Sequence, residues 1–109
     1  MAEPERLTLS GNTYVAYDFD VFPIDAKFQP VAAVYAVTRR TGRGGAQEHE
    51  VLYVGEADRL PEDFADHPKA DCFRSHNADC VGVLRQEAAD SRRATVADLV
   101  AQLKPPCND

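Results

Sequence analysis

The sequence lacks a long apolar run, an excess of basic residues and an even set of cysteines. No apolar run approaches the roughly 20 residues that a membrane-spanning helix needs. The N-terminus is acidic and lacks the apolar segment of a secretory signal. We therefore expect a cytoplasmic protein that makes no contact with a membrane.

Basic residues are outnumbered, because 12 lysines and arginines stand against 18 aspartates and glutamates and give a net charge of −6. This balance disfavours long-range capture of a polyanion such as DNA, but it allows a local basic patch. The glycine-rich segment between two expected strands supplies one, formed by Arg39, Arg40 and Arg43. Mild acidity by itself chiefly favours solubility.

The three cysteines are sparse and odd in number, which does not suggest a disulfide framework. Two of them fall among two histidines in a short segment that contains His67, Cys72, His76 and Cys80. Zinc is one interpretation of this cluster, although its spacing matches no common zinc motif. We favour the other interpretation, in which these cysteines are ordinary thiols.

Length and hydrophobic pattern predict one domain that spans residues 1–109, with 44% hydrophobic residues for its core. Alternating or continuous apolar runs predict strands at 6–10, 13–19, 31–37, 50–55 and 80–84. Helical patterns predict a helix at 58–66 capped by Asp58, a short one at 70–75, and a longer one at 87–103 that Pro105 and Pro106 end.

Two of the expected strands carry tyrosine motifs, Ala33-Val34-Tyr35 and Tyr53-Val54-Gly55. Together with the element order and the run Ala97-Asp98-Leu99-Val100, these motifs resemble the GIY-YIG endonuclease family over residues 31–109. At the offsets of that family, His67 matches a histidine and Asn108 matches a terminal asparagine.

The resemblance implies an α+β fold, a small, mainly antiparallel sheet flanked by helices. Residues 31–109 would form its core, and residues 1–30 would add an N-terminal β-hairpin. It also implies that the family's catalytic positions border one cleft, and these are Tyr35, Tyr53, His67 and Asn108 here.

Two positions depart from the family pattern. Asp63 stands where the family carries a catalytic arginine, and Val96 stands where it carries a glutamate that binds one Mg²⁺. Both family groups act on charge that develops in the transition state, and neither replacement conserves that chemistry. We therefore expect no cofactor.

These departures predict a catalytically degenerate nuclease-like domain that acts as a non-hydrolytic binding or regulatory module. Its partner would be a protein, or a nucleic acid held through Arg39, Arg40 and Arg43. The alternative is a metal-dependent endonuclease that cleaves DNA with relocated catalytic groups. A fold alone does not decide between these functions.

Overall fold

The computed structural model describes residues 5–24, 30–41, 48–60 and 67–108, which form a five-stranded antiparallel sheet and two helices. The strands are β1 (Glu5–Ser10), β2 (Ala16–Pro23), β3 (Val31–Thr41), β4 (Glu48–Leu60) and β5 (Cys80–Arg85). The helices are α1 (Ala70–Ser75) and α2 (Ala89–Leu103), and a 3₁₀ turn, η2 (Pro106–Asn108), follows them. The expected α+β class and the mainly antiparallel sheet are confirmed.

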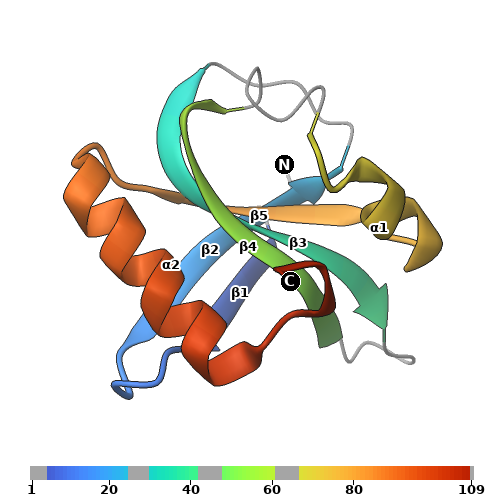
Figure 1. Ribbon diagram of the computed structural model, residues 1–109, viewed down its shortest axis with the longest axis horizontal. Helices are drawn as coiled ribbons and strands as arrows, with labels where there is room; N and C mark the ends of the chain where they lie inside the picture. The colour runs from blue at the N-terminus through green and yellow to red at the C-terminus, as the bar shows by residue number, and fades with distance from the viewer. Residues whose placement is uncertain (1–4, 25–29, 42–47, 61–66, 109) are drawn as a thin grey trace.

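The strand order is β1-β2-β5-β3-β4. β3 is the apolar strand predicted from the sequence, and it lies between β5 and β4. The N-terminal hairpin is also present, and its strand β2 pairs with β5. The hairpin therefore extends the same sheet rather than forming a separate layer (Figure 1).

The sheet has two differently covered faces because successive residues of β3 point to opposite sides. Ala33, Tyr35 and Val37 belong to the first core cluster, which also contains Phe73 of α1 and Cys107 of η2. We call this side the tyrosine face. Val34 and Ala36 belong to the second cluster, which α2 covers, and we call that side the α2 face.

Helix α2 buries a mixed stripe rather than a purely apolar one. Ala94 and Ala97, which the sequence pattern assigns to the apolar stripe, are exposed, whereas Arg92, Thr95 and Leu99 are buried. The helix ends at Leu103, the next residue Lys104 has a left-handed backbone with φ of 47°, and prolines follow as expected. No helix in the described part of the chain is long and apolar enough to cross a membrane.

The predicted start of a helix at Asp58 is wrong. Asp58 lies within β4, which continues to Leu60, and Leu60 pairs with Val31 of β3. Leu60 and Ala57 are buried in the tyrosine-face core, so tertiary packing outweighs the capping preference of the aspartate. The rest of that expected helix, residues 61–66, lies outside the described residues.

Candidate functional site

Tyr35 and Tyr53 lie on neighbouring strands, β3 and β4, with their ring centroids 6.0 Å apart. Gly55 is the residue paired with Tyr35 across the two strands. A Cβ atom at Gly55 would lie 2.6 Å from Tyr53 Cε1 and 2.8 Å from the Tyr35 hydroxyl oxygen. The glycine in Tyr53-Val54-Gly55 therefore makes room for both rings.

His67 is hydrogen-bonded to Tyr35, with 2.7 Å between Nε2 and the phenolic oxygen. Its Nδ1 accepts a hydrogen bond of 3.0 Å from the backbone N–H of Lys69. An accepting Nδ1 carries no proton, so in the neutral ring the proton is on Nε2 and is donated to Tyr35. The Tyr35 oxygen is therefore an acceptor in this pair.

The surroundings of His67 favour the neutral ring. Burial lowers the pKa of His67 below its usual 6.5, and the positive charge of Lys69 lowers it further. Protonation at Nδ1 would also remove the acceptor that the Lys69 N–H uses. The pair thus consists of two uncharged groups at neutral pH.

Phe73 completes an aromatic cluster with Tyr35, Tyr53 and His67. The ring of Phe73 lies 5.6 Å from that of Tyr53 and 5.0 Å from that of His67, and His67 packs edge-on against Tyr53 at 4.8 Å. Phe73 comes from α1, whose sequence signal is weak, and the one clue in the sequence was a large aromatic residue in this short, mostly polar segment. Sequence reasoning missed this residue.

Asn108 binds β4 rather than the tyrosine rings. Its side-chain oxygen accepts from the Val54 N–H at 2.8 Å, and its amide nitrogen donates to the Val54 carbonyl at 2.9 Å. Asn108 thereby satisfies both backbone groups of the residue that follows Tyr53. The C-terminal turn η2 lies beside β4 (Figure 1), and this pair of hydrogen bonds fixes it there.

A disulfide joins Cys72 of α1 to Cys107 of η2, with 5.9 Å between their Cα atoms. The expectation that the cysteines are ordinary thiols is therefore wrong for two of the three, and Cys80 is a buried thiol. The sequence did not predict this disulfide because the number of cysteines is odd and the two bonded cysteines are 35 residues apart. Of the suspected cluster His67, Cys72, His76 and Cys80, only Cys72 and His76 come together, and Cys107 is the third member of their group.

Val96 is not among the groups around Tyr35. It packs against the α2-face cluster, on the other side of the sheet from the tyrosine rings. Asp63 and Arg43 lie outside the described residues. Arg39 is half-buried and Arg40 is exposed, and the backbone N–H of Arg40 donates to the Asp79 carboxylate at 2.8 Å.

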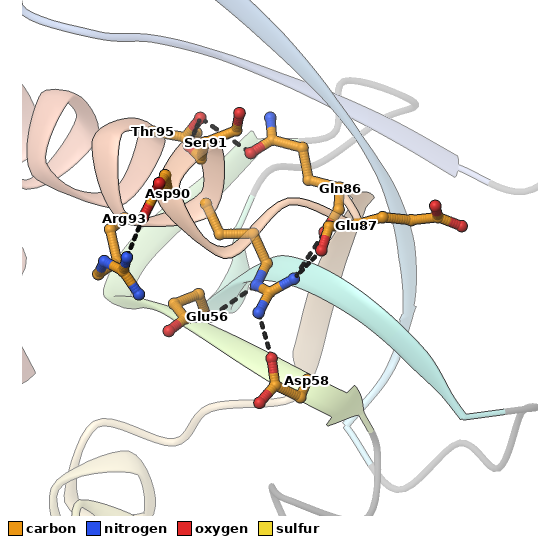
Figure 2. A network of polar contacts seen from close by, with 9 residues as sticks. Glu56, Asp58, Gln86, Glu87, Asp90, Ser91, Arg93 and Thr95 are labelled. Carbon is orange, nitrogen blue, oxygen red and sulfur yellow. Dashed lines mark hydrogen bonds and ion pairs between the residues drawn. The ribbon is translucent and has the colours of Figure 1, made fainter.

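The α2 face holds an ion network around a buried arginine, which the sequence did not reveal (Figure 2). Arg92 is 1% exposed and is the largest fully buried side chain among the described residues. Its Nε donates to Glu56 at 2.6 Å and its Nη2 donates to Asp58, while Nη1 donates to the carbonyls of Gln86 and Glu87. The hydrogen bond to Glu56 raises the pKa of Arg92 above its usual range, although burial opposes this.

Asp98 gives the Ala-Asp-Leu run a structural role. Its carboxylate accepts from the Thr13 N–H at 2.9 Å, from the Thr13 hydroxyl at 2.8 Å and from the Tyr17 hydroxyl at 2.8 Å. Burial of the carboxylate acts to raise the pKa of Asp98, but these hydrogen bonds outweigh it and lower the pKa. Asp98 therefore attaches α2 to the N-terminal hairpin.

Comparisons of the chain with protein-family models, with curated proteins and with solved structures give no match. Only the geometry of the site therefore indicates its chemistry. That geometry combines an enclosed, uncharged Tyr35–His67 pair, a tail fixed to β4 and two β4 carboxylates already bound by an arginine.

Proposed function

We propose that the chain is a non-hydrolytic binding or regulatory module built on a GIY-YIG-like domain. The enclosure of Tyr35 carries this proposal, because the side chain is 5% exposed and its partner His67 is 9% exposed. A tyrosine that helps a water molecule attack a phosphodiester must come within about 3 Å of that water or its phosphate. Tyr35 instead uses its hydroxyl oxygen as an acceptor for a buried neighbour.

The charges around β4 also support a role without hydrolysis. Glu56 and Asp58 follow the Tyr53-Val54-Gly55 motif on β4, and both are paired with Arg92. A cation that took either carboxylate would leave the buried guanidinium without that partner, which is unfavourable. A glutamate placed at position 96 would join the α2-face side chains rather than the aromatic cluster.

The partner we propose is a protein rather than a polyanion. The net charge of −6 opposes DNA at long range, and the resemblance places a carboxylate, Asp63, where a phosphate would bind. A nucleic acid would have to be held away from the aromatic cluster, through Arg39, Arg40 and Arg43. The two partners differ in how binding responds to salt.

The test of non-hydrolysis is a cleavage assay on the pure protein with supercoiled plasmid, linear duplex, single-stranded DNA and RNA, with Mg²⁺ or Mn²⁺. Tyr35→Phe is the matched variant, because it removes only the hydroxyl oxygen. We expect all substrates to stay intact at rates of the metal-only control, for both proteins. Metal-dependent nicking that Tyr35→Phe abolishes would instead establish the endonuclease.

A binding titration then separates the partner classes. Labelled duplex and single-stranded DNA are titrated with the natural protein and with the triple variant Arg39→Ala, Arg40→Ala, Arg43→Ala at low and moderate salt. We expect weak binding in both, at about 10⁻⁴–10⁻⁶ M or weaker at moderate salt. Tight binding whose salt slope falls by roughly 2–3 in the triple variant would make a nucleic acid the partner.

A further inference from the structure

Three side chains that bind soft metals meet at the junction of α1 and the C-terminal turn. The sulfur atoms of Cys72 and Cys107 and a ring nitrogen of His76 all lie within 4.8 Å of one another. Among the described residues, this is the one group of three or more histidine, cysteine and acidic ligands that could share an ion. It lies beside the aromatic cluster but contains none of its members.

The fold supplies this arrangement from two directions. Cys72 and His76 are four residues apart, and the His76 N–H donates to the Cys72 carbonyl at 3.1 Å, so the helical geometry extends to the histidine. Residues at this spacing lie on one face of a helix. Cys107 is brought to that face by η2, which Asn108 fixes to Val54 of β4.

We propose that this group is a redox-controlled zinc site: when the Cys72–Cys107 disulfide is reduced, the two thiolates and the His76 imidazole bind one Zn²⁺. The disulfide and the ion exclude each other, because a sulfur in a disulfide is not available as a thiolate ligand. Oxidation of the site therefore releases the ion, and reduction restores its binding.

The chemistry balances with a dithiol as the reductant. The dithiol transfers two electrons and two protons to the Cys72–Cys107 bond, which breaks into two thiols, while the dithiol becomes a disulfide. Zn²⁺ then replaces the two thiol protons, which are released to solvent. A small disulfide reverses the sequence. It accepts two electrons from the thiolates and two protons from solvent and becomes two thiols, while the protein disulfide forms again and Zn²⁺ is released.

The ligand types select zinc over the hard cations. Two thiolates and an imidazole are soft or intermediate ligands, which suit Zn²⁺ and not Mg²⁺ or Ca²⁺. The two thiolate charges cancel the charge of the ion, so little net charge is buried beside Cys107, which is 1% exposed. Cys72 and His76 are half-buried, which leaves a side from which the ion and a fourth ligand, a water molecule, can enter.

Neither His67 nor Cys80 is placed to act as a fourth protein ligand. Both ring nitrogens of His67 take part in hydrogen bonds, to Tyr35 and to the Lys69 N–H. Cys80 is buried on β5 and is not a member of the group. The proposed site therefore differs from the sequence cluster in gaining Cys107 and losing His67 and Cys80.

The test compares the oxidised and the reduced whole protein under anaerobic conditions, after the dithiol reductant has been removed. Zn²⁺ is titrated in competition with a chromophoric chelator, and Co²⁺ is used as a spectroscopic probe of thiolate ligands. We expect one Zn²⁺ per reduced chain, no comparable binding by the oxidised chain, and a thiolate-to-Co²⁺ charge-transfer band in the reduced chain only.

Matched variants assign the ligands. His76→Ala and Cys72→Ser should each weaken zinc binding of the reduced chain by roughly tenfold or more, since each removes one of three protein ligands. His49→Ala and Cys80→Ser are the controls, and each should bind zinc as the natural chain does. His76→Ala keeps the disulfide pair, so it decides the matter if Cys72→Ser fails to fold.

Three results would overturn the proposal. The first is equal zinc affinity of the oxidised and reduced chains, and the second is reduced protein without a thiolate band on Co²⁺. The third is loss of binding in Cys80→Ser together with full binding in His76→Ala, which would assign the ion to another set of residues.

Discussion

The two faces of the sheet are stabilised in different ways. The α2 face is covered by a helix of 15 residues. The buried Arg92 and the half-buried Asp98 tie that helix to β4 and to the N-terminal hairpin. The tyrosine face is covered by a helix of 6 residues and a turn of 3. These short elements are fixed by the Cys72–Cys107 disulfide and by the aromatic cluster.

This difference shows what stabilises each of the two helices. A helix of one or two turns is unstable by itself, so α1 depends on tertiary contacts and on its covalent link. Helix α2 is long enough to bury Leu99 and to position Arg92 over two β4 carboxylates. The functional proposals concern the tyrosine face, where a change of redox state or of pH acts on the smaller elements.

Removal of the disulfide should produce the largest loss of stability on the tyrosine face. In the double variant Cys72→Ala, Cys107→Ala, we expect the free energy of unfolding to fall by roughly 2–4 kcal/mol, because the link joins residues 35 positions apart in the chain. Denaturant unfolding in the presence of a metal chelator measures this. A loss below about 0.5 kcal/mol would show that the link adds little to the natural chain, and Cys80→Ala is the control.

Removal of the buried guanidinium should have the largest effect on the α2 face. Arg92→Met keeps much of the side-chain volume but leaves the carbonyls of Gln86 and Glu87 without their donor. We expect Tm to fall by roughly 10 °C. The neighbouring Arg93→Met is the matched control, because Arg93 is exposed and pairs with Asp90 one turn away, and its Tm should change by less than about 2 °C.

An equal effect of these two arginine variants would mean that Arg92 does not hold α2 to the sheet. The same result would mean that polar contacts do not stabilise the α2 face, which would then depend on apolar packing alone.

A methyl group at Gly55 should disturb the tyrosine face more than one at Gly82 disturbs the α2 face. The added Cβ at Gly55 meets both tyrosine rings below 3.0 Å, whereas the one at Gly82 meets Phe19 Cβ at 3.1 Å. We expect Gly55→Ala to cost about 1–3 kcal/mol and Gly82→Ala to cost less. Thermal unfolding of both variants, with near-ultraviolet circular dichroism of the tyrosines, measures this. A larger cost at Gly82 would contradict the packing described for the aromatic cluster.

Mild acid should weaken the tyrosine face through His67, and this is the smallest of the expected effects. The folded state lowers the pKa of His67, so the unfolded chain binds the proton more tightly. The contribution of the neutral His67 to the free energy of unfolding is fully present above pH 6.5. It falls as the pH drops below that value towards the pKa of His67 in the folded chain. His67→Gln should therefore lose less stability than the natural chain between pH 7.5 and pH 5.5, as measured by denaturant unfolding. An equal loss in both proteins would contradict a neutral buried His67.

The sequence was sufficient to predict most of the sheet. Alternation in the hairpin and the apolar run at 31–37 placed β1 and β3, and helical spacing with a following Pro105 placed α2. The second hairpin strand was expected at 13–19 but lies further along the chain, at Ala16–Pro23. These signals are local, since each depends on the period of one element. Tyr35 and Tyr53 were also expected on neighbouring strands, because each motif lies in a strand of one hairpin.

The missed features depend on contacts between distant segments. Asp58 looks like a helix cap in isolation, but β4 continues through it because Leu60 pairs with Val31. Arg92 looks like a surface residue until β4 supplies two carboxylates for it. The disulfide joins residues 35 apart in a chain with a third cysteine, and no local pattern distinguishes Cys107 from Cys80 as the partner.

The proposal depends most on an enclosed, uncharged Tyr35–His67 pair. The protonation state of His67 at neutral pH, observed by long-range ¹H–¹⁵N correlation of the imidazole, tests that pair directly. The assignment uses His67→Gln, which removes its signals, with His49 and His76 as internal references. We expect a neutral ring with its proton on Nε2, donated to Tyr35. A protonated ring, or a neutral ring with the proton on Nδ1, would contradict this, because Nδ1 would then carry a proton and could not accept from the Lys69 N–H.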